Sequence, residues 1–267
     1  MPRFAAVSRE RHGNKKWQRF TNYGFAAADA MVPIVGAEVG RAALAMPCAF
    51  MHEQEAGRYT LVVALSPIPG RNMFVGPDGS WLGPYVPFWF RVYPFRLLPA
   101  PGLDQPVLCV DEDSTLIVDR IAAGEEFFDA AGNLSPALKP VFEALMHVER
   151  NRKVTDLAVA ALAQADVIQP WPIKLKTDQG EQAVGGLHRV DETALRALPD
   201  EGFLKLRKAA ALPIAYAQML SVGQLGVFAL LARLHQQPGP PQRTAAALPE
   251  SIDSLLENLK DDMVRFN

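Results

Sequence analysis

The side chains best suited to binding chemistry lie in an aromatic segment that runs from Trp81 to Phe95. It holds seven of the chain's 23 aromatic residues within 15 positions, and three arginines, Arg71, Arg91 and Arg96, lie in or beside it. Aromatic faces and guanidinium groups together suit peptides, flat rings and carboxylates, through stacking and bidentate hydrogen bonds. The alternative is an aromatic core with arginine side chains lying across its rings. If the segment binds a ligand, we expect the contacts to come from Arg71, Asn72, Trp81, Tyr85, Trp89, Arg91 and Tyr93.

Alternating residues within this segment predict how it is exposed. The pattern over residues 85–98 favours strand, and its two prolines confine it to a sheet edge or divide it into shorter strands. Trp89, Arg91 and Tyr93 would then share one partly exposed face that forms the main ligand surface.

Groups that could carry out catalysis are sparse. The sequence has no P-loop, no GxGxxG after a strand, no GxSxG elbow and no HExxH motif. No second histidine is spaced to join His52 in a metal site, and the acidic run from Asp111 to Asp113 lacks the spacing of an EF-hand. We therefore expect no metal, no cofactor and no standard catalytic set. If the chain is nevertheless an enzyme, His52, Asp111 and Arg91 are the first base, acid and anion clamp to test.

Composition limits the class of protein and its partners. The 267 residues carry 27 basic and 29 acidic side chains, a net charge of −2 that argues against a nucleic-acid partner. The N-terminus has no continuous apolar stretch of the secretory kind, and Cys48 and Cys109 are too isolated for a disulfide framework. We expect a cytoplasmic protein with two buried, inert thiols.

One apolar segment raises the alternative of a membrane span, because residues 209–232 contain no charged side chain. Gln218, Ser221 and Gln224 form a polar stripe at helical spacing within it, and lipid offers amides no hydrogen-bond partner. The stripe favours a helix of a soluble protein that is largely buried and exposes this polar edge to water, rather than a span.

The order of the predicted elements indicates an α+β fold. The N-terminal half is β-rich with antiparallel hairpins, and the C-terminal half is mostly helical with one inserted hairpin. Expected strands or hairpins cover residues 59–65, 72–82, 107–118 and 173–190. Expected helices cover residues 135–150 and 212–235. Three further helices are expected to begin near Thr155, Asp191 and Asp200, each of which can cap a helix N-terminus.

Four regions follow from this reading of the chain. Residues 1–30 form a poorly ordered N-terminal arm, and residues 31–237 form one α+β domain that is β-rich to about 130. A proline-rich linker, 238–249, leads to an amphipathic helix over 250–267. Its apolar stripe must be covered by the parent domain, by a second subunit or by another protein, so residues 250–264 could also serve self-association. The stripe is made of Ile252, Leu255, Leu256, Leu259 and Met263.

Several short motifs, in order along the chain, resemble the bacterial SapC family. They are NMFV at 72–75, DGSW at 78–81, YVP at 85–87, RVYPF at 91–95, GEEFFD at 124–129, GNLS at 132–135, GLHRVDE at 186–192 and YAQMLS at 216–221. The likeness extends over residues 32–231 and leaves out the linker and the last helix. The resemblance implies an association with bacterial surface layers and neighbours such as TonB-dependent receptors, tryptophan-halogenase-like flavoproteins and cupin-like proteins. It implies no catalytic residues, and it does not extend to the unrelated peptide-transporter permease that shares the name.

Two hypotheses on function remain. The first is a non-catalytic accessory or binding protein of a surface-layer or TonB-dependent nutrient-uptake system, with a peptide, aromatic or carboxylate-bearing ligand. The second is an enzyme, or an enzyme's obligate partner, acting on peptide or aromatic substrates beside a halogenase-like or cupin-like protein. Convergence of His52 with an acidic side chain in one pocket would favour the second.

Overall fold

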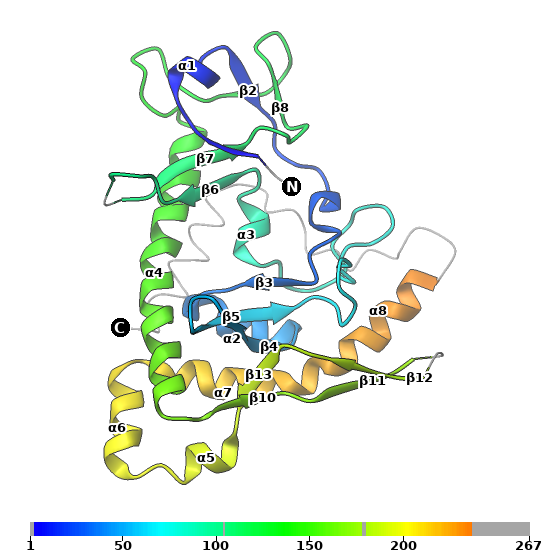
Figure 1. The fold of residues 1–267 in the computed structure, drawn as a ribbon. Coiled ribbons are helices and arrows are strands. Elements are labelled where there is room, and N and C mark those ends of the chain that lie inside the picture. The colour runs from blue at the N-terminus through cyan, green and yellow to red at the C-terminus, as the bar shows by residue number, and fades with distance from the viewer. Residues whose placement is uncertain (1–2, 104, 178–179, 237–267) are drawn as a thin grey trace. The chain divides into compact units, whose positions relative to one another are not determined.

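The chain divides into two compact units, described from a computed structural model that covers residues 3–103, 105–177 and 180–236. Unit 1 takes the N-terminal residues up to Thr21 together with Trp89–Arg150. Of the described residues, unit 2 takes Asn22–Phe88 and the chain from Asn151 to Gln236. The expected single domain over 31–237 is therefore two units built from interleaved segments (Figure 1). The predicted α+β class, strand-rich first and helical later, is confirmed.

Unit 1 contains two small antiparallel sheets. One has the order β1-β7-β6 and the other β8-β2-β9. Its core rings include Trp17 and Phe95, whose centroids are 5.0 Å apart, and Phe127, 6.1 Å from Phe95. The elements are β1 (Phe4–Ala6), α1 (Arg9–His12), β2 (Lys15–Trp17), β6 (Phe95–Leu98), β7 (Val107–Asp111), β8 (Ile117–Asp119), β9 (Glu125–Glu126) and the first half of α4 (Leu138–Gln164).

Unit 2 is built on a five-stranded antiparallel sheet of order β10-β13-β4-β5-β3 and a separate β11-β12 hairpin. Its strands are β3 (Met31–Pro33), β4 (Cys48–Glu53), β5 (Arg58–Ala64), β10 (Ile168–Pro170), β11 (Ile173–Thr177), β12 (Gly180–Val184) and β13 (Leu187–Val190). Its helices are η1 (Gly24–Ala26), α2 (Gly36–Ala45), the second half of α4, α5 (Glu192–Arg196), α6 (Asp200–Lys208), α7 (Ala211–Ser221), η2 (Val222–Gly226) and α8 (Val227–Gln236).

The N-terminal segment differs from the arm that we expected over residues 1–30. Strand β1 pairs with β7, β2 pairs with β8 and β9, and α1 lies between them. Their partners lie about a hundred residues later in the chain, so no local pattern could reveal the pairing. The expected pairing of residues 107–110 with 115–118 is also wrong, because β7 and β8 belong to different sheets. Each pairs instead with a strand from the N-terminal segment.

The aromatic segment also differs from expectation, because Phe88–Arg91 forms a short helix, α3, rather than an edge strand. Pro87 precedes it, and proline suits the first turn of a helix, where no N–H donor is needed. Phe88 and Phe90 are buried and Trp89 and Arg91 are partly exposed, as expected. On a helix, however, residues two apart do not face the same way, so the shared face expected from strand alternation does not follow for Trp89 and Arg91.

The helices differ from expectation in two ways, since two expected helices form one and another is divided. The helix from 135 and the one expected from Thr155 are a single helix, α4, in which the Thr155 hydroxyl donates to Asn151 O and accepts from Gly36 N–H (2.8 Å each). The helix expected over 212–235 is interrupted by the 3-10 segment η2, which contains Gly223 and Gly226. The linker and last helix expected over 238–267 lie outside the described residues.

The run Ala211–Gln236 is the one helical stretch among the described residues that is long and apolar enough to cross a membrane. Its most apolar window has a mean hydropathy of 1.6 and is 33% buried in the protein. Length and composition do not distinguish a span from a helix covered by protein, so the absence of a span stays a prediction.

Candidate functional site

The best-defined surface for chemistry is the outer face of the three-stranded sheet in unit 1. In the register of this sheet, Phe4 lies opposite Asp111, and Arg96 lies opposite Cys109. Since side chains alternate along a strand, Phe4 and Arg96 lie on one face, while Phe95 and its partner Val110 point into the core. Phe95 and Val110 are at most 1% exposed, and Arg96 is exposed.

Arg96 lies over two aromatic rings on this face. Its guanidinium carbon is 5.2 Å from the centroid of the Phe4 ring and 5.9 Å from that of Trp89. Arg96 makes no hydrogen bond or ion pair with another residue of the described part of the chain. Guanidinium has five N–H donors in a planar fork that matches a carboxylate. We call Phe4, Trp89 and Arg96 the arginine–aromatic surface; it can hold a carboxylate beside an apolar group.

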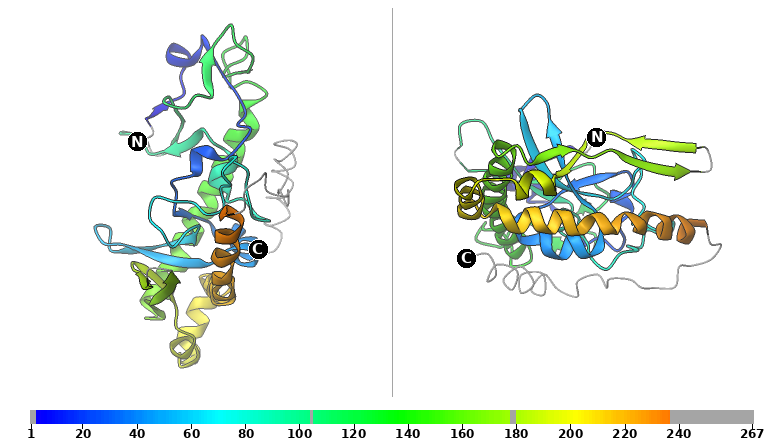
Figure 2. Two further views of the ribbon diagram at one scale, coloured as in Figure 1. Left: turned by 90° about the vertical axis from the view of Figure 1, so that its right-hand side faces the viewer. Right: turned by 90° about the horizontal axis from the view of Figure 1, so that it is seen from below.

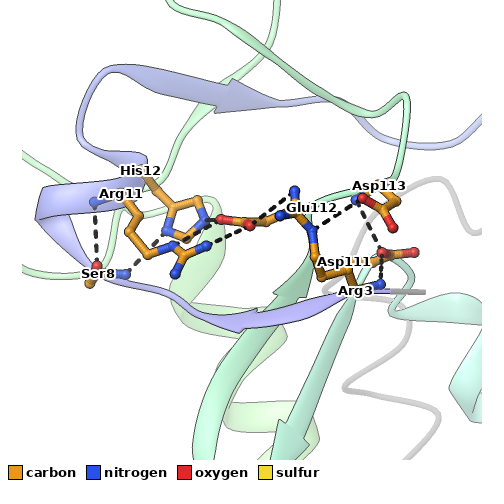
Figure 3. A network of polar contacts seen from close by, with 7 residues as sticks. All are labelled: Arg3, Ser8, Arg11, His12, Asp111, Glu112 and Asp113. Carbon is orange, nitrogen blue, oxygen red and sulfur yellow. Dashed lines mark hydrogen bonds and ion pairs between the residues drawn. The ribbon is translucent and has the colours of Figure 1, made fainter. Parts of the chain in front are cut away.

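Next to this surface, Asp111 ends β7 as a buried carboxylate that is 4% exposed. Its Oδ1 accepts hydrogen bonds from the backbone N–H groups of Arg3 (3.0 Å) and Asp113 (3.2 Å), as Figure 3 shows. The Tyr93 hydroxyl donates to Oδ2 at 3.4 Å, and burial is the main reason that the pKa of Tyr93 is raised. With both oxygens engaged by its own unit, Asp111 is placed to hold the N-terminal strand rather than to exchange protons with a ligand.

Glu112 joins α1 to the turn after β7 through two basic side chains (Figure 3). Arg11 donates from Nε (3.0 Å) and Nη2 (2.7 Å), and these bonds are the main cause of the lowered pKa of Glu112. The His12 ring is fully buried, accepts from the Ser8 N–H at Nδ1 (3.2 Å) and places Nε2 3.4 Å from Glu112 Oε1. That last contact has the distance of an ion pair but not the geometry of a hydrogen bond.

The protonation state of His12 follows from these contacts. Burial lowers its pKa, and the nearby Glu112 carboxylate opposes that shift only in part. An Nδ1 that accepts a hydrogen bond leaves the proton of the neutral ring on Nε2, facing Glu112. Both ring nitrogens therefore face their own unit, and His12 is built to hold α1 in place rather than to act as a base on a ligand.

The residues predicted to bind a ligand divide between the units. Trp89, Arg91 and Tyr93 belong to unit 1, and each is partly exposed, so a ligand could reach all three side chains. Arg71, in unit 2, is exposed as well. Their role in binding stays a prediction.

The other three predicted residues, Asn72, Trp81 and Tyr85, are buried in unit 2. Asn72 Nδ2 donates to Ala26 O (3.1 Å), and Trp81 Nε1 donates to Tyr85 O (2.8 Å). The Tyr85 hydroxyl donates to Glu38 (2.7 Å), a carboxylate that is 1% exposed. These contacts favour the alternative of an aromatic core for this part of the segment.

The residues named in case the chain is an enzyme also fall in different units. His52 lies exposed on β4 of unit 2, with its ring 4.7 Å from Tyr59 and 6.2 Å from His188. Asp111 and Arg91 belong to unit 1. Within the described part of the chain, His52 bonds to no acidic side chain, and no group of three or more metal-ligating side chains gathers. Cys48 and Cys109 are both buried, as expected.

Sequence reasoning missed two members of the arginine–aromatic surface. Arg96 was noted among the arginines of the aromatic segment but not in the predicted set, and Phe4 was assigned to the arm. Alternation over β6 could have placed Arg96 outward. No signal in the sequence pairs β1 with β7, so Phe4 could not have been found.

A model of the family described as SapC matches residues 7–227. The chain belongs to the SapC family. The match takes in Trp89, Arg96 and the Asp111–Asp113 turn, but it begins after Phe4 and ends at the start of α8. No curated protein and no solved structure matches this SapC chain significantly.

Proposed function

We propose that this SapC-family protein is a non-catalytic binding or accessory protein whose ligand presents a carboxylate beside an aromatic or apolar group. The observation that carries the proposal is Arg96, an exposed guanidinium over the rings of Phe4 and Trp89 that makes no ion pair with another described residue. The C-terminus of a peptide, or an aromatic acid, has the required chemistry.

The arrangement supports binding energetically as well as geometrically. A hydrogen bond from Arg96 to a ligand carboxylate would contribute about 1.5–3 kcal/mol to binding. A cation–π contact of Arg96 with a ligand ring at this exposed site would contribute about 0.5–1 kcal/mol. Contact with two rings restricts the Arg96 side chain before a ligand arrives. Less of its conformational entropy, up to about 2 kcal/mol for an arginine, is then lost on binding.

The biological setting comes from the family likeness. We propose that the protein serves a surface-layer or TonB-dependent uptake system, from a cytoplasmic location. Binding is favoured over catalysis because His52 meets no acidic partner among the described residues, and because the oxygens of Asp111 are occupied by backbone and tyrosine donors. Among the described residues, no arrangement gives the enzyme hypothesis comparable support.

Calorimetric titration with N-acetyltryptophan and with its neutral amide tests the proposal. We expect the acid to bind the wild-type protein more tightly than the amide, and Arg96→Gln to weaken the acid about tenfold or more, since the substitution removes a charge-assisted bond. Arg120→Gln is the matched control, because Arg120 is an exposed arginine of the same unit. Equal affinity for acid and amide, or an equal loss in the control, would show that the arginine–aromatic surface is not the site.

A further inference from the structure

Unit 2 leaves one side of a helical run uncovered by its described residues. The run comprises α7, η2 and α8, which follow one another almost without a break in Figure 2. Leu220 is 78% exposed, Leu230 is 56% exposed and Tyr216 is 47% exposed. With exposed Pro213 and Gly223 they recur at intervals of three, four or seven residues, the spacing of one helix side.

Helix α2 extends this uncovered side. Leu44, in its last turn, is 78% exposed, and Gly40, one turn earlier, is exposed and carries no side chain. The two helices run side by side: Gly36, the first residue of α2, lies against Ile214, and Cys48, just after α2, bonds to Ser221 (2.9 Å). Leu44 and the C-terminal end of α7 are therefore neighbours. We call Leu44, Tyr216, Leu220 and Leu230 the apolar helix face.

The opposite side of α7 shows that this orientation is built in. Gln218 and Ser221 were expected at the wet edge of the helix, but they are fully buried, because both bond to backbone groups of neighbouring strands. Gln218 accepts from Val190 N–H (2.8 Å) and donates to Cys48 O (3.2 Å), while Ser221 accepts from Cys48 N–H. Rotating α7 to bury Leu220 would break all three bonds, so an apolar side must face outward.

We propose that the apolar helix face is the docking site of this chain's own C-terminal segment, residues 250–264. This segment carries an apolar stripe, Ile252, Leu255, Leu256, Leu259 and Met263, which matches an uncharged helix surface in length and spacing. Docking would bury the apolar stripe of the segment against the exposed leucines of the apolar helix face.

The tether between them is long enough. The described chain ends at Gln236, and 15 residues separate it from Ile252. Fully extended, they reach about 50 Å, whereas the helical path from Gln236 back to Leu220 is about 24 Å. A tethered segment also has a high effective concentration at a surface within reach.

Charge favours this occupant over an anionic membrane. The segment 250–264 holds five acidic side chains, Glu250, Asp253, Glu257, Asp261 and Asp262, against Lys260. Its net charge of −4 (1 minus 5) would be repelled by acidic lipid. The helices that carry the apolar helix face instead hold basic residues, Arg41 on α2 and Arg233 on α8.

Disulfide trapping in the full chain tests the proposal. Leu220→Cys combined with Leu256→Cys places a thiol on each surface, while Cys48 and Cys109 are buried and their pKa values are raised. The control pairs Leu256→Cys with Gln54→Cys, an exposed residue in the turn at the far end of β4. We expect the first pair to form an intramolecular disulfide about tenfold faster than the control, at a rate independent of protein concentration.

Two results would overturn the proposal. Equal rates for the two pairs would mean that the segment does not dock on this face. A rate that rises with protein concentration and yields crosslinked dimers would mean that a second copy occupies it.

Leu220→Glu and Leu259→Glu give a second measurement without added thiols. We expect each to lower the melting temperature by about 2–4 °C in a protein that stays monomeric, and Asn258→Glu, off the stripe, to leave it unchanged. Binding of wild-type protein to phosphatidylglycerol vesicles that is lost in Leu220→Glu but kept in Leu259→Glu would assign the face to a membrane instead.

Discussion

The two units join segments that are far apart in the chain, but they do so with different chemistry. In unit 1, Arg11 and Glu112, 101 residues apart, meet as an ion pair beside the buried ring of His12. In unit 2, Gln218 and Ser221 reach Cys48 across 170 and 173 residues through uncharged hydrogen bonds. Both ties hold a helix against a strand, α1 against the end of β7 and α7 against β4.

The difference lies in exposure and in sensitivity to pH. Arg11 keeps a side chain that is 53% exposed, so its pair with Glu112 is partly screened by water. The Gln218 and Ser221 side chains are fully buried, and an unmet hydrogen bond there has no water to replace it. The stability of unit 2 should therefore be more sensitive to single substitutions, and the stability of unit 1 should be more sensitive to pH.

The largest effect should come from Gln218→Leu, which leaves Val190 N–H without a partner and Cys48 C=O with only the longer contact of the Ser221 hydroxyl (3.5 Å). Each unmet buried group costs about 1–3 kcal/mol, so we expect a loss of about 2–4 kcal/mol of unfolding free energy by urea titration. Gln224→Leu is the control, since Gln224 is half-buried and makes no side-chain hydrogen bond with a described residue. A loss below about 0.5 kcal/mol for Gln218→Leu would contradict the assigned role of the buried amide.

The next effect is the pH dependence of unit 1. Burial lowers the folded-state pKa of His12, and burial with Arg150 lowers that of His147 in the same unit. The unfolded chain then binds more protons, so stability falls as pH drops through about 6.5. The lowered pKa of Glu112 adds a contribution that is present above its ordinary value of 4.5 and lost as pH falls through the folded value.

Hydrogen exchange at pH 7 and pH 5, followed by mass spectrometry, can separate the units. We expect protection to fall at pH 5 in residues 3–17 and 107–111, with less change in residues 48–64 and 211–221. His12→Gln combined with His147→Gln should flatten the loss between pH 7 and pH 5. An equal loss in both units would refute the proposed division.

A smaller effect is expected for Glu112→Gln, which removes the charge that pairs with Arg11 and lies beside the neutral ring of His12. Because the partner is exposed, we expect a loss of about 1 kcal/mol, less than for Gln218→Leu, seen as faster exchange in residues 3–12. Asp119→Asn, an exposed acid on β8, serves as the control and should change little. If Glu112→Gln costs more than Gln218→Leu, the ionic tie is the stronger one and the comparison is reversed.

The smallest effect concerns the two thiols, one in each unit. Burial raises the pKa of Cys48 to about 12 and also raises that of Cys109, so both should react slowly with maleimide in the folded protein. Labelling then follows local opening of each unit. We expect the ratio of Cys109 to Cys48 labelling, read by peptide mass spectrometry, to rise modestly from pH 7 to pH 6. A constant ratio would mean that the units open together.

Several features of this SapC protein followed from local patterns alone. The α+β order, the strand over 58–64, the hairpin from Ile173 and the cap at Asp191 all depend on residues close in sequence. Local propensity and periodicity suffice for such features because they set the backbone and the buried side of one element.

The features that define the candidate site depend on pairing across the chain. Phe4 meets Arg96 because β1 and β6 both pair with β7, and His12 meets Glu112 because α1 packs beside the end of that strand. Even the division into two units, with its boundary between Phe88 and Trp89, separates neighbours in the predicted ligand surface. Periodicity separates the polar and apolar sides of an element, but it does not tell which distant element covers either side, and on α7 it is the polar side that is buried. That choice is made by the packing free energy of the whole chain, so only the tertiary structure could identify the arginine–aromatic surface.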